Sequence, residues 1–222
     1  MILILRGHIR SSFNSNRLYN FIKLLNENYN IDIYIHTWNI KQSNASWRSI
    51  SEDLTIINEE LIYNYFNDLK HLIKHIIIDD DTKIKLVGDL EGTICRSRCK
   101  KLHWKNYLYG QFRIIEYINE NIVDQHIINT RFDIFENSNN FSEENILHFI
   151  SKQDGNITKN IFIVNKLIGG IDNIFYGNKY TMYKLIKHMY FNLDEICSRH
   201  TKLLNQEYLF FGENNRIFAD GA

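Results

Sequence analysis

Arg131 and Asp133 lie two positions apart near the end of an apolar segment, residues 125–135, that we predict to be a buried strand. In open α/β sheets, ligands bind just beyond the carboxyl ends of the strands. A carboxylate at that edge can hold a divalent cation, and a guanidinium can pair with phosphate oxygens. The pair could therefore bind the diphosphate of a nucleotide sugar. The alternative is that Asp133 caps the following turn while Arg131 pairs with an unrelated carboxylate.

A second group of basic residues follows the first predicted strand, Ile2–Leu5. Arg6 and Arg10 could bind phosphate oxygens, and Gly7 permits a tight turn and a close approach of the backbone to a ligand. The amides at the start of the next helix could also face an anion. The loop lacks the spaced glycines of a dinucleotide-binding turn and the Gly-Lys-Ser/Thr of a Walker loop. An ordinary strand-to-helix connection is an equally good interpretation.

His36 and Trp38 end the second predicted strand. Aromatic side chains at that place could stack on a nucleobase or a sugar ring. Trp47 and Arg48, in the loop that follows, could close over the bound group. In the alternative interpretation, Trp38 packs against the sheet edge and His36 forms a hydrogen bond with the backbone.

Two other clusters are rival metal sites. Asp79–Asp81 contains Asp-x-Asp behind three isoleucines. Because those isoleucines continue the apolar stripe of a predicted helix, we interpret the three aspartates as a solvated turn. Cys95, Cys99 and His103 recur every four residues, whereas structural zinc uses four ligands at tighter spacings, so we expect no zinc there.

Short apolar segments alternate with segments of helical periodicity along the chain, which is typical of βαβ units and a mainly parallel sheet. We predict a single α/β domain, a twisted sheet flanked by helices, with a nucleotide-binding half (1–135) and an acceptor-side half (136–222). The predicted strands are residues 2–5, 31–36, 84–87, 125–135 and 161–164, and residues 168–175 approach the sheet again. The predicted helices are residues 16–28, 58–75 and 103–121, one that carries Met182 to Met189, and a short one near 205–211.

Composition excludes several classes of protein. The chain has 222 residues with 26 basic and 26 acidic side chains, so it lacks the basic excess of a nucleic-acid-binding domain. No apolar run approaches the length of a membrane helix, so we expect no transmembrane segment. Three cysteines cannot form a closed disulfide framework, which favours a reducing compartment. The ending Gly221–Ala222 does not look like a natural terminus, and we expect the chain to be cut from a longer one.

Several short motifs occur in an order that resembles a known group of enzymes. Their positions coincide with predicted strand ends or with predicted helices, and each motif alone has little specificity. They are Arg6-Gly7-His8-x-Arg10, Ile35-His36-Thr37-Trp38-Asn39, a helix that carries Gln111, Thr130-Arg131-Phe132-Asp133, Gly170-Ile171-Asp172-Asn173-x-Phe175-Tyr176-Gly177 and Asn205-x-Glu207-Tyr208. Together they resemble the GT-A-type glycosyltransferases of bacterial surface-polysaccharide clusters and of large DNA viruses, over most of the chain.

The resemblance implies a role for each of these residues. The nucleotide would face Arg6, Gly7 and Arg10, and its base or ribose would lie beside His36 and Trp38. The diphosphate, or the metal that bridges it, would be held by Arg131 and Asp133. On the acceptor side, Asp172 would be the general base and Glu207 its rival. The interpretations that need no function are that Asp172 caps the turn after Gly169-Gly170, that Glu207 is an ordinary helix-face carboxylate, and that Gln111 faces solvent rather than a sugar hydroxyl.

The implied activity is transfer of a sugar from a nucleotide-diphosphate sugar, with UDP as the expected nucleotide, to a hydroxyl of a glycan or glycoprotein. Mn²⁺ or Mg²⁺ is the expected cofactor. The usual metal-binding marker is Asp-x-Asp, and the first carboxylate is replaced by Arg131, which could take over part of the cation's role. The expected location is the cytoplasm, or the host cytoplasm for a viral chain. A sugar-phosphate nucleotidyltransferase and a non-catalytic sugar-binding or scaffolding domain are the alternatives.

Overall fold

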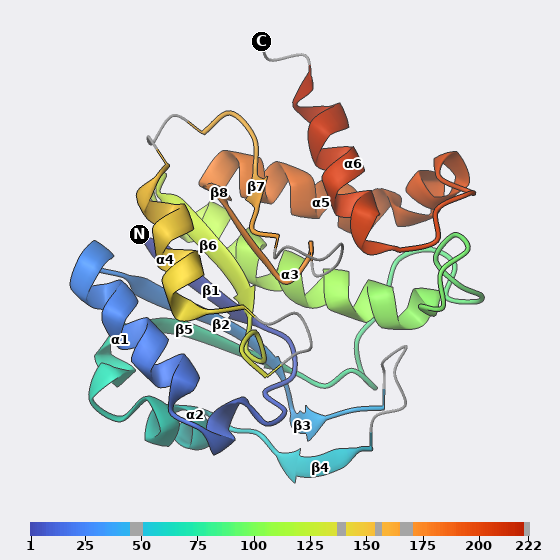
Figure 1. Ribbon diagram of the computed structural model, residues 1–222. Coiled ribbons are helices and arrows are strands. Elements are labelled where there is room, and N and C mark those ends of the chain that lie inside the picture. Colours follow the sequence, from blue (N-terminus) through green and yellow to red (C-terminus); the bar gives the residue numbers. More distant parts are fainter. Residues whose placement is uncertain (45–50, 137–140, 154–156, 165–170, 220–222) are drawn as a thin grey trace.

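Strongly apolar segments of the sequence form the centre of a six-stranded sheet. A computed structural model describes residues 1–44, 51–136, 141–153, 157–164 and 171–219. The central strand β1 (Ile2–Arg6) is buried along its whole length. Such continuous apolar runs are characteristic of parallel strands that are covered on both faces. Figure 1 shows the resulting layers, a sheet between two groups of helices.

The sheet is parallel in one part and antiparallel in the other. Its order is β5-β2-β1-β6-β8-β7. β2 (Asp32–Trp38), β5 (Ile73–Asp79) and β6 (His126–Arg131) run parallel to β1, whereas β8 (Ile174–Asn178) and the short β7 (Ile161–Phe162) run antiparallel. The predicted α/β class with a mainly parallel sheet is therefore confirmed.

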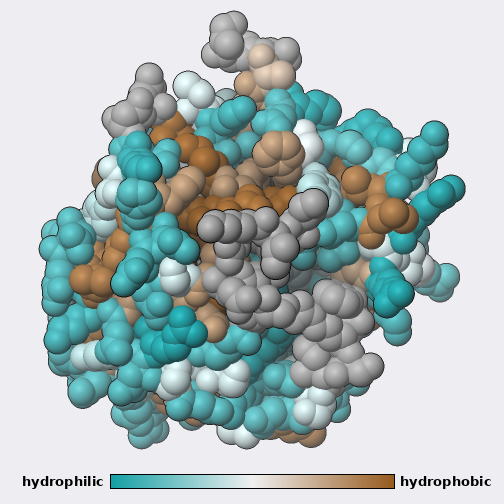
Figure 2. Space-filling model, viewed as in Figure 1, coloured by the Kyte–Doolittle hydropathy of each residue, from teal (hydrophilic) through white to brown (hydrophobic). Residues whose placement is uncertain are grey.

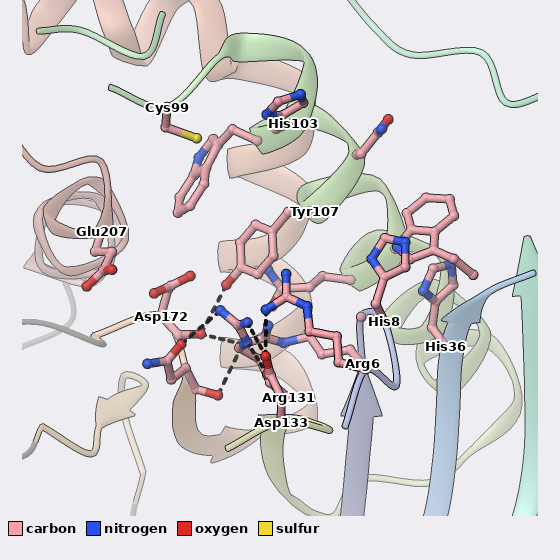
Figure 3. Close-up of a pocket in the computed structure, with 18 of the residues that line it drawn as sticks. Arg6, His8, His36, Cys99, His103, Tyr107, Arg131, Asp133, Asp172 and Glu207 are labelled. Carbon is pink, nitrogen blue, oxygen red and sulfur yellow. Dashed lines mark hydrogen bonds and ion pairs between the residues drawn. The ribbon is translucent and has the colours of Figure 1, made fainter. Parts of the chain in front are cut away.

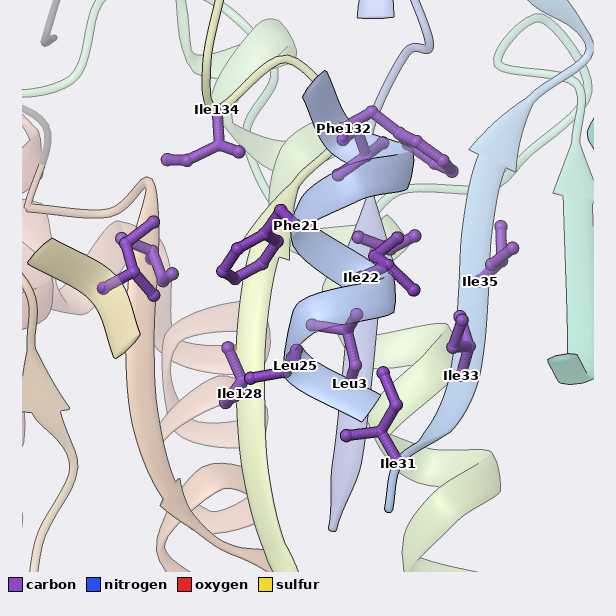
Figure 4. Close-up of a cluster of buried hydrophobic side chains, with 14 of the residues drawn as sticks. Leu3, Phe21, Ile22, Leu25, Ile31, Ile33, Ile35, Ile128, Phe132 and Ile134 are labelled. Carbon is purple, nitrogen blue, oxygen red and sulfur yellow. The ribbon is translucent and has the colours of Figure 1, made fainter. Parts of the chain in front are cut away.

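Alternate residues of β1 point into two separate cores. Leu3 and Leu5 pack with α1 (Arg17–Tyr29), α2 (Glu59–Phe66) and α4 (Glu143–Ser151). On the other face, Ile2 and Ile4 pack with the second group of helices, α3 (Lys101–Asn121), α5 (Lys179–Arg199) and α6 (Glu207–Ile217). Figure 4 shows how the inner side of α1 lies against the first face of the sheet. In Figure 2, hydrophilic side chains cover the outer helices, and hydrophobic ones gather around β7 and β8.

Two predicted elements are wrong. The helix predicted for residues 58–75 ends at Phe66, a 3-10 segment (Asn67–Leu72) follows, and the isoleucines before Asp79 belong to β5. β-Branched residues favour strands, and here that preference, together with pairing to β2, outweighs the helical spacing of the apolar residues. Residues 84–87, predicted to be a strand, are irregular. They follow β5, which is already the edge of the sheet, and none of the described strands pairs with them.

Other element boundaries also differ from the prediction. β6 ends at Arg131, and Asp133 lies in the turn that follows. The loop after β2 contains a small antiparallel pair, β3 (Ile40–Gln42) and β4 (Asp53–Ile56), that the sequence pattern did not reveal. The prediction also omitted α4, although Ser142 caps it by accepting a hydrogen bond from the Asn145 backbone amide, as its sequence allows. The predicted break at residues 136–140 lies almost wholly outside the described residues.

A buried carboxylate holds α6 against α5. Glu213, fully buried, accepts hydrogen bonds from His188 (2.7 Å), His200 (3.1 Å), Arg199 (3.1 Å) and Arg216 (2.9 Å). Burial raises the pKa of Glu213, but the hydrogen bonds from Arg216, His188 and His200 more than offset that effect and lower the pKa to about 2. The carboxylate is therefore ionised over the whole physiological range. Its contacts fix α6, the helix that begins at Glu207.

We expect Glu213→Gln to lower the free energy of unfolding at pH 7 by about 1.5–3 kcal/mol, the range of a hydrogen bond to a charged group. The loss is limited because the arginine partners are partly exposed and can be rehydrated. The pKa of Glu213 is lower in the folded state than in the unfolded state. The difference in free energy of unfolding between the wild type and Glu213→Gln should therefore be complete above about pH 4.5 and disappear as the pH falls toward 2. Urea titrations across this pH range measure it. Glu195→Gln, at an exposed carboxylate, is the control and should change little.

Candidate functional site

One pocket gathers the residues to which the family resemblance gave a binding or catalytic role. It lies at the carboxyl edge of the parallel strands (Figure 3). Its lining includes Arg6, Gly7, Arg10, His36, Trp38, Arg131, Asp133, Asp172 and Glu207, and also Gln111. The structure shows that these residues line one pocket, whereas the roles assigned to them stay predictions.

The topology explains why these residues meet. β1 and β6 are parallel neighbours and end in register, with Arg6 opposite Arg131; β2, on the other side of β1, places His36 opposite Arg6. β8 is antiparallel, so it begins at the edge where the others end, and this brings Asp172 beside them. β2 and β5 lie on one side of β1, and the chain then crosses to β6 on the other side. Such a switch in direction opens a crevice at the carboxyl edge.

Asp133 is clamped between two arginines. Arg131 Nε and Nη2 donate to its two carboxylate oxygens at 2.7 Å each, and Arg10 Nη1 donates to Oδ2 at 2.6 Å. Burial raises the pKa of Asp133, but Arg131 and Arg10 outweigh it and lower the pKa to about 2. Asp133 therefore does not cap the turn in the way that the alternative interpretation required, and the carboxylate partner of Arg131 is Asp133 itself. Arg131 Nη1 also donates to Asn173 Oδ1 at 3.2 Å.

This arrangement does not fit a divalent cation at Asp133. Both carboxylate oxygens already accept from guanidinium groups, and these positive charges would repel a metal ion at that position. Within the part of the chain that the structure describes, no group of three or more His, Cys, Asp or Glu side chains could hold a metal. Asp79, in the rival acidic cluster, accepts hydrogen bonds from His36 and Arg113. Metal binding at Asp133 stays a prediction, and the contacts favour guanidinium groups in its place.

Arg6 organises the pocket floor. It is almost fully buried; its Nε donates to Asn129 Oδ1, and its Nη2 donates to the backbone carbonyl of Asp172. Asn129 Nδ2 in turn donates to Gln111 Oε1 at 3.3 Å. Because Asn129 must accept from Arg6 with its oxygen, this chain of contacts fixes the orientation of both amides. Gln111 is fully buried, so the interpretation that it faces solvent is wrong, and its Nε2 has no partner among the described residues.

The loop after β1 is held by backbone hydrogen bonds. Gly7 N donates to His36 O at 3.1 Å, and Arg10 N donates to Lys41 O at 2.9 Å. Gly7 has a φ of 88°, in the left-handed region that favours glycine, and Arg10 has a φ of 52°. A non-glycine residue held at positive φ costs energy that the surrounding structure must supply. The strained backbone at Arg10 places its guanidinium on Asp133.

His8, His36 and Trp38 form the aromatic end of the pocket. Trp38 stacks on Tyr109 with ring centroids 6.1 Å apart, and the rings of His8 and Trp38 are 6.0 Å apart. His36 is fully buried, and its ring Nε2 interacts with Asp79 Oδ2 at 3.3 Å. Burial lowers the pKa of His36 and, with help from Arg10, lowers that of His8 to about 3. Both imidazoles are therefore neutral at pH 7.

Gly110 lets the His36 ring lie against α3. A Cβ at position 110 would come within 2.5 Å of His36 Cε1. We expect Gly110→Ala to lower the free energy of unfolding by about 1–3 kcal/mol through overpacking, and to displace the aromatic end. Gly212→Ala on α6 is the matched control, since its Cβ would meet nothing closer than 3.8 Å; it should be neutral or slightly stabilising. Urea titrations of both variants measure the difference, and equal effects would contradict the packing argument.

Asp172 and Glu207 form the acidic side of the pocket. Asp172 is 4% exposed, and its backbone carbonyl is held by Arg6 and by the Tyr107 hydroxyl at 3.0 Å. Its carboxylate also interacts with the Tyr107 hydroxyl. Glu207 Oε2 accepts from Ile171 N at 3.3 Å. Both carboxylates therefore stand on the same side of the pocket, and the role of general base stays a prediction for each.

Sequence reasoning missed one wall of the pocket, which α3 supplies. His103, Tyr107 and Gly110 recur at helical spacing, and this stripe could have been found in the sequence. The other lining residues not anticipated for the site are His8, Cys99, Trp104, Asn106, Asn173 and Gln206. Cys95, Cys99 and His103 do not share a helix face, because α3 begins only at Lys101. The loop residues Trp47 and Arg48, and Gly169-Gly170, lie outside the described residues.

Several buried polar atoms on the pocket lining have no hydrogen-bond partner in the described chain. They are His8 Nε2, His36 Nδ1, His103 Nδ1, Trp104 Nε1, Asn106 Oδ1 and Gln111 Nε2. Buried polar groups in folded proteins are nearly always paired, so such a concentration around one pocket points to a polar ligand or ordered water. The pocket is thus a candidate site for a ligand rich in oxygen and nitrogen atoms.

No helix among the described residues has both the length and the apolar character needed to span a bilayer. Comparison with known proteins finds no matching family model, no matching curated protein and no matching solved structure.

Proposed function

We propose that the chain is a glycosyltransferase of GT-A-like architecture, which moves a sugar from a nucleoside-diphosphate sugar to a glycan hydroxyl. One observation carries the proposal: the pocket places guanidinium groups between an aromatic end and an acidic side. Figure 3 shows Arg6 and Arg131 between His8 on one side and Asp172 on the other. In this order, the aromatic end would face the base of a nucleoside-diphosphate sugar, the guanidinium groups its diphosphate, and the acidic side its reacting sugar. UDP is the expected nucleotide.

In the proposed reaction, the leaving diphosphate gains negative charge as the glycosidic bond breaks. Arg131 and Arg10 would stabilise this charge, since fixed positive groups aimed at developing charge supply the largest part of many rate enhancements. Arg131 already keeps a rigid fork geometry against Asp133, and such a fork also suits phosphate oxygens. Asp133 thus orients the two guanidiniums. In an inverting reaction, Asp172 would take the proton of the acceptor hydroxyl.

Thermal unfolding with a panel of nucleotides tests the proposal. A ligand that binds the native state raises its stability by mass action, by about 2.7 kcal/mol at a concentration of 100 Kd. We expect UDP or another nucleoside diphosphate to stabilise the protein, and the shift to survive EDTA. No shift with any nucleotide would overturn the proposal. A shift that requires Mn²⁺ and persists in Asp133→Ala would instead direct attention to Asp79 and Asp81.

The product then distinguishes the enzyme classes. Release of a nucleoside diphosphate from a donor sugar, in the presence of EDTA, is the expected result. Release of pyrophosphate from a nucleoside triphosphate and a sugar phosphate would identify a nucleotidyltransferase. Glycan binding that is indifferent to nucleotides would identify a non-catalytic module.

A further inference from the structure

The first turns of α3 form a pocket wall whose residues have no role in the proposed reaction. This α3 wall consists of His103, Trp104, Asn106 and Tyr107, all of which line the pocket. Figure 3 shows His103 and Tyr107 on the side of the pocket away from the strand ends, with Asp172 and Glu207 beside it. The wall therefore lies next to the acidic side, where the reacting group of a ligand would be.

The α3 wall offers hydrogen-bonding groups that the described protein does not use. Trp104 is 5% exposed, and its Nε1, a pure donor, has no partner among the described residues. Asn106 Oδ1 and His103 Nδ1 also lack partners among the described residues. A ligand hydroxyl could satisfy each of these atoms, because a hydroxyl both donates and accepts.

The wall also has an apolar component and no charge at neutral pH. The rings of Trp104 and Tyr107 stack with centroids 4.7 Å apart. Burial raises the pKa of Tyr107 well above its ordinary value and raises that of the neighbouring Cys99 to about 12, so both stay protonated. Burial likewise lowers the pKa of His103, which favours the neutral imidazole. A neutral wall with aromatic rings and free polar atoms suits an uncharged carbohydrate ring.

The charges around the wall argue against an acidic sugar. The carboxylates nearest to it are Asp172 and Glu207, whereas the described pocket lining contains no lysine. Arg6 lies 4.9 Å from the centroid of the Tyr107 ring, but it already donates to Asn129 Oδ1 and to the Asp172 carbonyl. Arg10 and Arg131 pair with Asp133 and are assigned to the diphosphate in the proposed function. A carboxylate on the sugar ring would therefore meet like charges with little compensation at this end of the pocket.

We propose that the α3 wall is the subsite for the transferred sugar and that it selects an uncharged hexose over the corresponding uronate. Trp104 Nε1 donates to one sugar oxygen, and Asn106 Oδ1 accepts from a sugar hydroxyl. The inference rests on the proposed function, because it assigns the sugar part of the same donor.

Isothermal titration calorimetry with UDP, UDP-glucose and UDP-glucuronate tests the subsite. The two sugars differ at C6, where one carries a carboxylate. The useful quantity is the sugar increment, which is the Kd of UDP divided by the Kd of the UDP-sugar. The variants are Trp104→Phe, which keeps the ring and removes the N–H, and Asn106→Ala, with Asn121→Ala at the far end of α3 as the matched control. If GDP is the nucleotide that stabilises the protein, the set becomes GDP, GDP-mannose and GDP-mannuronate.

We expect the wild-type increment to be about tenfold larger for UDP-glucose than for UDP-glucuronate. Trp104→Phe and Asn106→Ala should each reduce the glucose increment about fivefold, the effect of one lost hydrogen bond, while the Kd of UDP stays within about twofold. Equal increments for the two sugars, or increments that neither variant changes, would overturn the subsite and leave the proposed function intact. Failure of the wild-type protein to bind any of the nucleotides would overturn both.

Discussion

Arg131→Ala is expected to lower turnover by about 10²–10³, the cost of removing one group that stabilises developing charge in other enzymes. It should also abolish most of the thermal stabilisation by nucleotide. Arg131 is held by Asp133 and by Asn173, so its guanidinium is oriented before a ligand arrives. Steady-state release of nucleoside diphosphate and thermal unfolding with nucleotide measure the two effects.

The same substitution has a structural cost that must be separated from the catalytic one. Asp133 is 5% exposed and, among the described residues, would keep Arg10 as its one ion-pair partner. Breaking a buried pair costs about 3–5 kcal/mol, and urea titration measures it. Arg131→Lys keeps a positive charge but cannot form the fork, so it should remain folded with intermediate activity.

Arg17→Ala is the matched control for Arg131→Ala. Arg17 pairs with Glu143 at 3.1 Å on the surface, where its side chain is 47% exposed. Exposed pairs contribute about 0–1 kcal/mol, and the hydrogen bond that Arg17 donates to Phe135 O adds about 1 kcal/mol, so this variant should lose little stability and keep its activity. Turnover of Arg131→Ala within about threefold of wild type, in a folded protein, would remove Arg131 from the mechanism.

Asp172→Asn is expected to reduce turnover about 10²–10⁴-fold while nucleotide binding stays nearly unchanged, if the reaction inverts the anomeric centre. The substitution preserves the shape of the side chain and the backbone carbonyl that Arg6 and Tyr107 hold. It removes the ability to accept a proton, together with the negative charge that faces Arg6 and Arg131, so nucleotide affinity must be measured as well. Turnover and nucleotide affinity, measured on the same preparation, separate a lost base from a disturbed pocket.

Glu207→Gln is the comparison for Asp172→Asn, since Glu207 is the rival base on the same side of the pocket. A large loss in Glu207→Gln, with Asp172→Asn close to wild type, would transfer the role to Glu207. Turnover within about threefold of wild type in both variants would mean that no side-chain base is needed, as expected of a retaining reaction. The stereochemistry of the product then provides an independent check.

Much of the sheet and the membership of the site followed from the sequence. A continuous apolar run marked β1, and shorter apolar stretches marked β2 and β6, because strands covered on both faces are largely apolar. The segments that connect them are long enough for parallel crossovers, so their carboxyl ends had to meet at one edge. Side chains at those ends, such as Arg6, His36 and Arg131, were therefore predictable neighbours.

Other features could not be read from local patterns. The isoleucines before Asp79 fit a helical stripe and a buried strand equally well, and pairing with β2 decided between them. Helix packing decides which side of α3 faces the pocket. The spacing of residues along a helix shows which of them share a face, but it does not show where that face points. Arg6 was expected to face the nucleotide, but it donates hydrogen bonds to Asn129 Oδ1 and to the backbone carbonyl of Asp172.

The Arg131 and Asp133 pair illustrates the division. The sequence alone determined that one guanidinium and one carboxylate stand at the end of a buried strand, because strand length and side-chain chemistry are local properties. Only the tertiary structure decided what the carboxylate binds, since Arg10 reaches it from a loop 123 residues away along the chain. That long-range contact gives Asp133 two positive partners, which explains why its surroundings favour guanidinium groups over a metal ion.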